Sequence, residues 1–338
     1  MYVVYLSGLC VHISQNARSG WLHTSQEWKL HLLTFLPVSV AVDSVHLFVF
    51  QKDEPELLFP WILYHSRIVG LKNLHIIDHN STNMEVVRIL QACEKHDVDV
   101  DYFTESFASK QHVISAKMKA YHNESSLLIP LDTDEFIVSL VNSSNVNQFS
   151  AKSQVIRRNL MRLPYGSHKL KFNGSFQAVS TMTGSVSLRP FAAVHFQRRE
   201  LSCMSKTFYS ANTFVRTDQG NHHGTIKTPC TAQSSAWNAQ CNDCFHVANL
   251  ALAHFDVSST SFGSSLSKHL RGAKAYGHDK VVDEGKPCKG NGVHYCQYLK
   301  QLKRVGSQRL ESEFYASRLR APGQYNSEVV EALVEPYQ

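Results

Sequence analysis

The sequence lacks any apolar stretch of the roughly 18 uninterrupted residues that a membrane-spanning helix needs. The most apolar segment at the start of the chain, residues 1–13, is short and is interrupted by Ser7, Gly8 and His12. It also lacks a basic start before its apolar run and a clear cleavage site of small residues, which together mark a secretory signal. We therefore expect a soluble chain with no membrane span, either cytoplasmic or, if an upstream anchor is missing, Golgi-lumenal.

Long basic runs are also absent. The 34 Lys and Arg residues against 28 Asp and Glu residues give a formal net charge of +6, but the basic residues are scattered in short clusters such as Arg157-Arg158. A mild positive balance alone would suit an anionic small substrate as well as a nucleic acid. Because no recognised motif appears and aromatic residues do not interleave with a basic stripe, we expect no nucleic-acid partner.

A second CxxC motif is missing, although the cysteines gather in the C-terminal half at Cys230, Cys241, Cys244, Cys288 and Cys296. The motif that is present, Cys241-Asn-Asp-Cys244 with His246 nearby, fits a zinc site, a disulfide-bonded region or paired loop thiols. The missing partner motif weakens the zinc interpretation. The sequence leaves disulfides, zinc ligands and free thiols open for these cysteines.

What the sequence does contain is an alternation of strand-like and helix-like segments. Short apolar runs predict strands at residues 45–50, 74–77, 98–103 and 127–131. Apolar residues at helical spacing predict helices between them at residues 60–69, 82–94 and 109–122, with Pro60 near the first turn of one and Ser81 or Thr82 capping the next. This order predicts an α/β fold with a mostly parallel, doubly wound sheet.

The remaining segments divide the chain further. Residues 1–42 form an N-terminal segment of unknown role with a predicted helix at residues 25–36 that ends at Pro37. Residues 43–140 and 141–280 form two halves of one domain, and residues 281–338 form a helical extension. In the second half we predict short strands at residues 185–188 and 192–196 and a helix at residues 261–276.

Polar clusters follow three of the predicted strands, where ligands bind in parallel sheets. They are Lys52-Asp53-Glu54, the run from Asp78 to Asn83, and Asp132-Thr133-Asp134-Glu135. Asp132 and Asp134 could both reach a hard cation, Mn²⁺ or Mg²⁺, although two Asp residues near a turn are commonly a solvated loop or a cap. Asp78 could accept from a pyrimidine ring N–H or from ribose hydroxyls, or could shape an Asx turn together with Asn80.

These motifs resemble the family 2-like and family 92-like glycosyltransferases of GT-A fold. The resemblance rests on Lys52-Asp53-Glu54, residues 61–65, 76–83 and 131–137, and continues through residues 198–206, 218–224 and 252–255 with Lys268 downstream. It covers about residues 43–280. Two departures are Asn83, where the turn commonly ends in Asp, and the cysteine-rich insertion from Cys230 to Cys244.

The resemblance implies a GT-A sheet whose first half, residues 43–140, binds a nucleotide sugar and whose second half, residues 141–280, binds the acceptor. It implies that Asp53, Glu54 and Asp78 lie near the nucleoside, that Asp132 and Asp134 bind the metal, and that His254 is a late metal ligand. Lys52 and Asn80 belong to the same donor loops. Lys206, Lys268 and Arg271 could neutralise phosphate, although a solvated helix face explains Lys268 and Arg271 equally well.

Two further roles concern histidines and a base. His223 lies in a His222-His223 pair beside glycines, where an imidazole could bind metal, phosphate or an acceptor hydroxyl, so we name it with His254 as a metal-ligand candidate. An inverting transfer needs a group that takes the proton of the acceptor hydroxyl. We favour Asp218 because it precedes the histidine pair, then Glu200, and also name Glu135.

The sequence thus predicts a metal-dependent glycosyltransferase, with a uridine diphosphate sugar as the expected donor and a glycan or other hydroxyl compound as the acceptor. Family likeness favours inversion. Two alternatives remain at this point: a non-catalytic sugar-nucleotide or glycan-binding module of the same fold, and a zinc-dependent hydrolase that uses the C-terminal cysteines and histidines.

Overall fold

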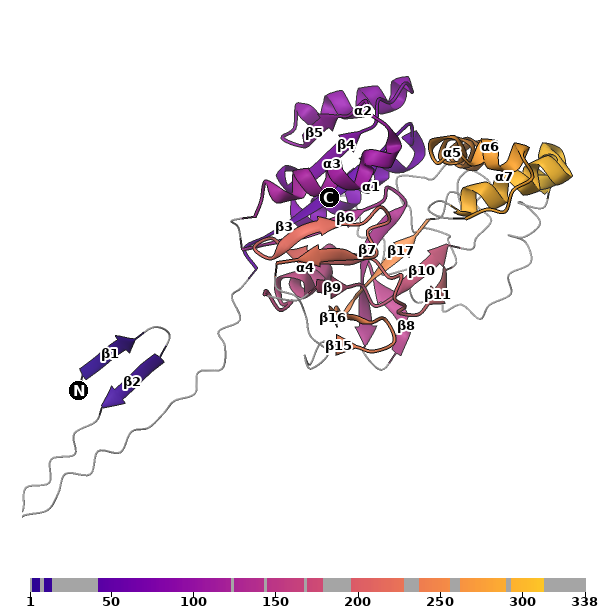
Figure 1. The fold of residues 1–338 in the computed structure, drawn as a ribbon. Coiled ribbons are helices and arrows are strands. Elements are labelled where there is room, and N and C mark those ends of the chain that lie inside the picture. The colour runs from indigo at the N-terminus through magenta and orange to yellow at the C-terminus, as the bar shows by residue number, and fades with distance from the viewer. Residues whose placement is uncertain are drawn as a thin grey trace, which may run out of the picture. The chain divides into compact units, whose positions relative to one another are not determined.

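The computed structural model describes residues 2–6, 9–13, 42–122, 125–142, 145–166, 169–178, 196–227, 237–255, 262–289 and 293–312. The chain divides into two units, residues 1–40 and 41–338. In the first unit, β1 (Tyr2–Leu6) pairs with β2 (Leu9–Ile13) as an antiparallel hairpin (Figure 1). The helix predicted at residues 25–36 lies outside the described residues.

The second unit contains an eight-stranded sheet with the strand order β15-β16-β9-β12-β6-β3-β4-β5 (Figure 1). Four neighbouring strands in it are parallel: β5 (Asp99–Tyr102), β4 (Leu74–Asp78), β3 (Ser44–Gln51) and β6 (Ser126–Leu131). β12 pairs antiparallel with β6 and extends the sheet beyond it. The strands beyond β6 are, in order, β12 (Thr207–Ser210), β9 (Lys169–Lys171), β16 (Asp243–Val247) and β15 (Trp237–Asn238).

Helices cover both faces of the parallel strands. They are α1 (Pro55–Val69), α2 (Met84–Glu94), α3 (Lys110–Lys119) and the short 3-10 turns η1 (Leu71–Asn73) and η2 (Phe107–Ser109). Leu47 and Val49 of β3 pack in the same core as residues of α1 and α2, whereas Phe48 and Phe50 pack in a second core with residues of α3. Because successive side chains of a strand point to opposite faces, this uninterrupted apolar run is buried on both sides.

A second, five-stranded sheet has the order β11-β10-β17-β7-β8. Its strands are β7 (Glu135–Asn142), β8 (Asn145–Ser150), β10 (Ser175–Ala178), β11 (Phe196–Arg199) and β17 (Leu250–His254), and α4 (Ser153–Met161) packs against β7. A separate hairpin pairs β13 (Phe214–Thr217) with β14 (Gly224–Ile226). The predicted strand at residues 185–188, and residues 192–195 of the next, lie outside the described residues.

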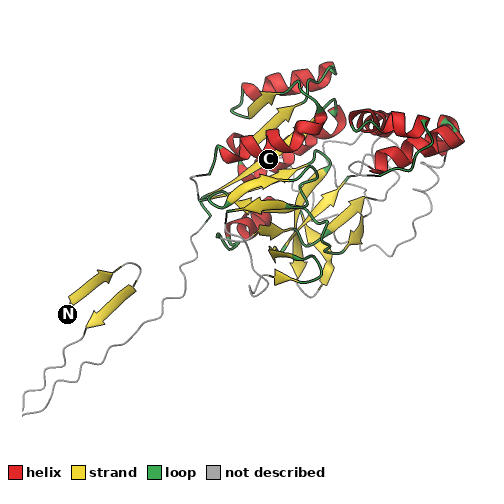
Figure 2. Cartoon of the chain, in the orientation of Figure 1, coloured by secondary structure: helices red, strands yellow, loops and turns green. Residues whose placement is uncertain are grey.

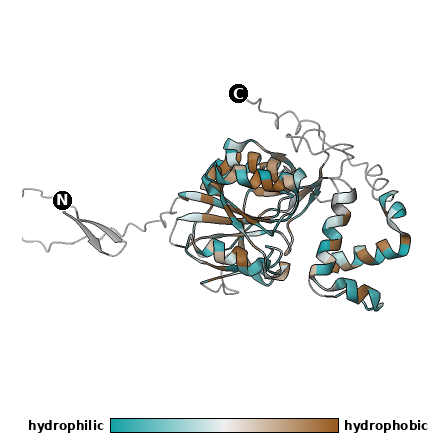
Figure 3. Ribbon diagram, turned by 90° about the horizontal axis from the view of Figure 1, so that it is seen from above, coloured by the Kyte–Doolittle hydropathy of each residue, from teal (hydrophilic) through white to brown (hydrophobic). Residues whose placement is uncertain are grey.

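The C-terminal part of the described chain is helical. Figure 3 shows α5 (Phe262–Ala275), α6 (His278–Asp283) and α7 (Val293–Val305) grouped together, and residues 307–312 are also helical. The observed α5 agrees with the helix predicted at residues 261–276. A disulfide between Cys288 and Cys296 ties the segment before α7 to that helix.

The start of α1 differs from its prediction. The helix begins at Pro55 rather than near Pro60, which lies inside it. Pro55 occupies the first turn, where a backbone N–H has no partner within the helix and its loss therefore costs little. The extra turn brings Leu57 and Leu58 into the core.

The cap of α2 also differs from its prediction. Asn83, rather than Ser81 or Thr82, is the N-cap residue, and its side-chain oxygen accepts from the backbone N–H groups of Glu85 and Val86 at 2.9 and 3.3 Å. Asn is as good as Asp at this position because both side chains present an oxygen to the unpaired N–H groups of the first turn. The departure noted at Asn83 therefore preserves the turn.

The predicted α/β fold class is confirmed: a parallel sheet with helices on both faces leads into a second sheet (Figure 2). The chain passes between the sheets at the turn of Asp132, Thr133 and Asp134, since β6 belongs to the first sheet and β7 to the second. Within the described residues, no helix is long and apolar enough to cross a membrane.

Candidate active site

The three predicted loops meet at the carboxyl edge of the parallel strands. The Asp53 side chain accepts from the backbone N–H groups of Thr82 and Asn83 at 2.7 and 2.8 Å, which joins the loop after β3 to the loop after β4. The Thr133 hydroxyl donates to the Glu54 carboxylate, which joins the loop after β3 to the turn after β6. Because β3 lies between β4 and β6, its loop is the one that can bridge both neighbours.

Asp132 is held by two lysines. Lys110 Nζ lies 2.7 Å from Asp132 Oδ1, and Lys206 Nζ lies 2.5 Å from Asp132 Oδ2. Burial alone would raise the pKa of Asp132, but the attraction of the two ammonium groups and their hydrogen bonds outweigh it and hold the pKa well below its ordinary value. Asp132 is therefore an ionised carboxylate with both oxygens paired.

Asp134 is paired through only one oxygen. Lys268 Nζ of α5 lies 3.0 Å from Asp134 Oδ2 and 3.7 Å from Glu54 Oε1. Asp134 Oδ1 is buried without a hydrogen-bond partner in the described part of the chain, and His254 Nε2 lies 3.6 Å from it. Burial would raise the pKa of Asp134, but Lys268 and His254 outweigh this effect and lower it. The site therefore contains a buried anionic oxygen that is not satisfied by hydrogen bonding.

Glu135 is the one predicted base that the described contacts join to this cluster. Its Oε2 accepts from the Asp132 backbone N–H at 2.9 Å, and its Oε1 lies 3.3 Å from Lys206 Nζ. Its pKa is raised, first by burial and then by the negative charge of Asp132, against the opposing effect of Lys206. A carboxylate with a raised pKa is a better proton acceptor than an ordinary one.

Asp218, the favoured base, shapes the loop that contains the histidine pair. Its Oδ1 accepts from the His222 backbone N–H at 2.7 Å, and its own N–H donates to the His223 carbonyl at 2.9 Å. Glu200 is exposed directly after β11. In the described part of the chain, no hydrogen bond or ion pair joins Asp218 or Glu200 to the Asp132 and Asp134 turn. The roles of Asp218 and Glu200 as catalytic bases stay predictions.

Of the two neighbouring histidines, His222 is the one that faces the cluster. Burial and then the charge of Lys206 lower the pKa of His222 to about 4, against the opposing charge of Asp218. Gly220 makes room for its ring, because a Cβ at that position would lie 2.6 Å from His222 Cδ2. Within the described residues no ion pair joins the His223 imidazole to Asp132 or Asp134, so its predicted ligand role also stays a prediction.

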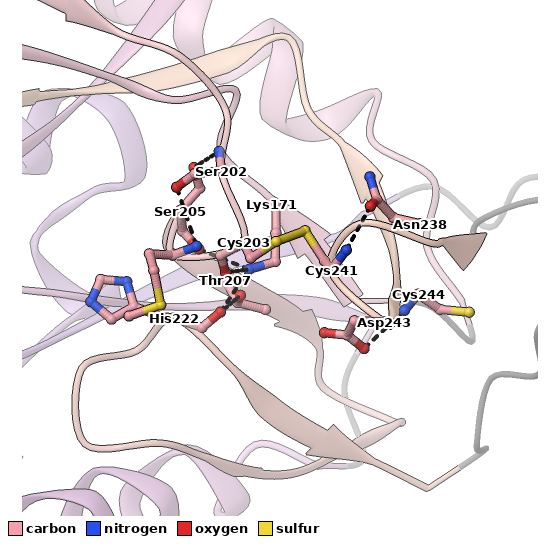
Figure 4. Close-up of a disulfide and its surroundings, with 11 residues drawn as sticks. Lys171, Ser202, Cys203, Ser205, Thr207, His222, Asn238, Cys241, Asp243 and Cys244 are labelled. Carbon is pink, nitrogen blue, oxygen red and sulfur yellow. Dashed lines mark hydrogen bonds between the residues drawn. A yellow bond between two sulfur atoms is a disulfide. The ribbon is translucent and has the colours of Figure 1, made fainter. Parts of the chain in front are cut away.

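A buried lysine fixes the segment that carries Lys206. Lys171 Nζ donates to the carbonyls of Cys203, Ser205 and His222 at 2.8, 3.0 and 2.8 Å (Figure 4). In the same close-up, a disulfide joins Cys203 to Cys241 beside Lys171. The backbone directly before Lys206 is thus anchored to the backbone of the His222 loop, which limits where the Lys206 charge can lie.

Residues predicted near the nucleoside mainly stabilise the loops in this structure. Asp78 is buried, and its side chain accepts from the Ser81 backbone N–H at 2.9 Å and from the Gln51 amide. The contact with Ser81 agrees with the alternative that Asp78 shapes an Asx turn. Asn80 is exposed, and its carbonyl accepts from Lys52 Nζ at 3.3 Å. The Lys52 carbonyl in turn accepts from Arg271 at 3.3 Å, which links α5 to the loop after β3.

The cysteine alternatives are resolved in favour of disulfides. Cys241 is bonded to Cys203, Cys288 is bonded to Cys296, and Cys244 is also disulfide-bonded. Sulfur atoms in disulfides are not thiolate ligands, so the zinc site at Cys241-Asn-Asp-Cys244 is wrong and the zinc-hydrolase alternative loses its cysteines. Cys230 lies outside the described residues.

The fit of a divalent cation can be judged from the donor atoms. In the described part of the chain, no group of three or more His, Cys, Asp or Glu side chains is arranged to hold a metal. The reason is visible at Asp132, whose two oxygens both face ammonium groups. Asp134 Oδ1 and His254 Nε2 nevertheless present an oxygen and a nitrogen 3.6 Å apart, close to the spacing of roughly 3 Å expected between neighbouring ligands of Mn²⁺ or Mg²⁺.

Two residues of the site were missed at the level of the sequence. Lys110 opens α3, and its position in the loop region after β5 could have identified it as a group at the same sheet edge. Gln177 Oε1 lies 3.0 Å from His254 Nδ1. No sequence signal points to Gln177, because its neighbour is reached only through the pairing of β10 with β17.

No protein-family model matches the chain, and no curated protein matches it. Solved structures similar to it include three of TarS from S. aureus. TarS 1–349 in complex with UDP has 10% sequence identity and a TM-score of 0.30, with 50% of this chain and 47% of that one covered. A second TarS 1–349 structure has 8% sequence identity and a TM-score of 0.34, with 68% of this chain and 65% of that one covered. A structure titled TarS has 10% sequence identity and a TM-score of 0.32, with 86% of this chain and 49% of that one covered. The chain spans about half of two of these structures and 65% of the other.

Proposed function

We propose that the chain is a metal-dependent glycosyltransferase that moves a sugar from a nucleoside diphosphate donor, expected to be a uridine one, to a hydroxyl of a glycan or another acceptor. The observation that carries this proposal is the ionised pair Asp132 and Asp134 at the carboxyl edge of a parallel sheet, where open α/β sheets bind ligands. Asp134 Oδ1 is buried, has no hydrogen-bond partner in the described part of the chain and lies 3.6 Å from His254 Nε2, so it is the carboxylate oxygen best placed to meet a cation.

The charge balance of the cluster favours the joint binding of donor and cation. The ammonium groups of Lys110, Lys206 and Lys268 face the carboxylates of Asp132, Asp134, Glu54 and Glu135, so most of the charge of the cluster cancels. A sugar nucleotide is an anion and Mn²⁺ or Mg²⁺ is a divalent cation. The two together change the charge of the site far less than either does alone. The lysines that leave the carboxylates become available to phosphate oxygens, which ammonium groups bind well.

Individual residues take the following roles. Asp134 and His254, with Asp132 once its lysines have turned to the donor, would hold Mn²⁺ or Mg²⁺. Such a cation, when bound, supplies positive charge to the departing diphosphate. Lys206 and Lys268 neutralise phosphate oxygens next to the two aspartates of the turn, since one contacts Asp132 and the other Asp134.

The acceptor side is assigned to the C-terminal half, and the resemblance favours inversion. An inverting reaction needs a base, and Glu135 is supported by its raised pKa and by its contact with the cluster. Asp218 acts through the loop that it holds, and Glu200 stays a second prediction. A Glu135→Gln variant that keeps donor hydrolysis and transfer at the parent rate would refute the base assignment.

The direct test measures nucleoside diphosphate release from a panel of sugar nucleotides, with Mn²⁺ and simple sugar acceptors. We expect Asp134→Asn to lower the rate by about 100-fold or more, because it removes charge from the atom that faces the cation. Asp101→Asn is the matched control. Asp101 lies on the edge strand β5 and pairs with Lys117 of α3, and not with a residue of the cluster. Equal rates for Asp134→Asn and the parent would refute the metal assignment. Donor binding by calorimetry without product under any metal would favour the non-catalytic binding module.

A further inference from the structure

Lys171 is a buried cation that the proposed function does not use. It ends β9, and its side chain is fully buried. Burial lowers the pKa of Lys171 to about 8, against the opposing charge of Asp243, so the ammonium group still carries its protons at neutral pH. Asp243 itself pairs with Lys169. Because the burial of a cation costs free energy, the contacts of Lys171 must serve a purpose that offsets this cost.

The ammonium group of Lys171 joins two separate segments of backbone. It donates to the carbonyls of Cys203 and Ser205 at 2.8 and 3.0 Å and to the carbonyl of His222 at 2.8 Å (Figure 4). An ammonium group has three N–H donors and no acceptor, so each donor here meets one carbonyl. A glutamine amide would offer only two donors. Lysine is therefore suited to hold the segment before Lys206 against the segment of His222.

Backbone hydrogen bonds continue this attachment at Lys206 itself. The Lys206 carbonyl accepts from the Phe172 N–H at 3.2 Å, and the Thr207 N–H donates to the Asn221 carbonyl at 2.8 Å. Phe172 follows Lys171 directly, and Asn221 belongs to the second segment that Lys171 holds. The attachment by Lys171 is made by a side chain, so a substitution can remove it and leave these backbone hydrogen bonds in place.

The side chain of Lys206 depends on this backbone for its position. Lys206 is only 7% exposed, and its Nζ lies 2.5 Å from Asp132 Oδ2 and 3.3 Å from Glu135 Oε1. A misplacement of about 1 Å in a group that positions a substrate can cost about 100-fold in rate. The ammonium group of Lys206 is thus sensitive to any loosening of the segment before it.

We infer that Lys171 is a positioning residue for donor binding: its ammonium group holds the segments of Ser205 and His222 together, so that Lys206 meets the diphosphate of the donor. The inference rests on the proposed function, because Lys206 neutralises phosphate there. Lys171 touches no substrate and acts through Lys206. Its loss should therefore matter for the donor only when Lys206 is present.

The first measurement is the affinity for UDP by calorimetry, with and without Mn²⁺. We expect Lys206→Met to bind UDP about 10- to 100-fold more weakly, because one charge-assisted hydrogen bond to phosphate is lost. Lys171→Met should bind UDP about 10-fold more weakly than the parent. In the Lys206→Met background, the same Lys171 substitution should change the affinity by less than about twofold, because effects that pass through one residue do not add.

Lys169→Met is the matched control. Lys169 is a buried lysine of the same strand, but its ammonium group pairs with Asp243 and donates to the Gly224 carbonyl at 3.3 Å. This variant should lose stability and keep the parent affinity for UDP. Lys171→Gln, which retains two of the three donors, should bind UDP with an affinity between those of the parent and Lys171→Met.

The second measurement needs no ligand. In urea denaturation, the effects of Lys171→Met and Lys206→Met on the free energy of unfolding should not add, because a misplaced Lys206 contributes less to its pair with Asp132. The effects of Lys169→Met and Lys206→Met should add. If Lys171→Met does not fold, Lys171→Gln takes its place in both measurements.

The inference is overturned if Lys171→Met binds UDP as tightly as the parent, or if it weakens UDP binding equally with and without Lys206. Additive effects of Lys171→Met and Lys206→Met in urea would overturn it as well. A parent protein that binds no UDP under either condition would instead refute the proposed function. In that case the urea measurements alone decide whether Lys171 positions Lys206.

Discussion

Replacement of Lys268 by methionine should unmask the acidic site, and the structure gives the size of the effect. The Lys268 ammonium group lies 3.0 Å from Asp134 Oδ2 and 3.7 Å from Glu54 Oε1, and the side chain of Asp134 is only 6% exposed. The loss of one partner of a buried pair costs about 3–5 kcal/mol because the other charge is left uncompensated. Since the Lys268 side chain is 25% exposed, water reduces the loss, and we expect about 3 kcal/mol.

The same variant should gain a response to metal. In the parent, Lys268 holds Asp134 Oδ2, so Mn²⁺ without nucleotide should change the free energy of unfolding little. In Lys268→Met this oxygen is available, and Mn²⁺ at 100 times its dissociation constant should restore about 3 kcal/mol.

Urea denaturation with and without Mn²⁺ measures both effects. Lys274→Met is the control, because Lys274 is an exposed residue of the same helix. The reasoning is refuted if Lys268→Met is as stable as the parent and Lys274→Met, or if Mn²⁺ stabilises parent and variant equally.

The remaining predictions concern stability. His65 is fully buried. Its Nδ1–H donates to the Trp61 carbonyl, its Nε2 accepts from the Ile137 N–H, and burial lowers its pKa from 6.5 to about 3. As pH falls, the unfolded chain therefore takes up a proton at His65 before the folded chain does, and the free energy of unfolding should decline by about 1.4 kcal/mol per pH unit below pH 6.5. Urea denaturation of the parent should show a steeper dependence on pH than that of His65→Gln, and equal slopes would contradict this. Gly272→Ala should lower the free energy of unfolding by about 1–3 kcal/mol, because its Cβ would lie 2.6 Å from ring atoms of Tyr295; thermal denaturation should show recovery when Tyr295→Leu is added, and an unchanged single variant would argue against the packing.

The sequence was sufficient for features that depend on local pattern. The uninterrupted apolar runs of β3, β4 and β6 indicate strands buried on both faces, and the observed bounds agree with the predictions. The position of Asp132 and Asp134 at the end of such a strand places them at the ligand edge, since parallel strands share that edge. Local pattern thus led to the right region of the fold.

The sequence was insufficient where partners meet through tertiary contacts. The closeness of Asp218 to two histidines along the chain could not show that its oxygen also accepts from the His222 backbone N–H, or that Glu135 contacts the Asp132 backbone. Nor could the pattern show that Lys110 and Lys206 would pair with Asp132, since these residues come from different elements. The register between β10 and β17, which places Gln177 on His254, is equally non-local.

The disulfides have a practical consequence for anyone who produces this protein. Disulfides such as Cys203–Cys241 and Cys288–Cys296 form and persist in oxidising compartments. In a reducing cytosol, the glutathione and thioredoxin systems keep such cysteines reduced. Protein produced in a periplasm or an endoplasmic reticulum should therefore contain the Cys203–Cys241 disulfide next to the segment that carries Lys206. Assays on protein from an ordinary bacterial cytosol would report on a differently anchored chain, and their negative results would say little about the chemistry.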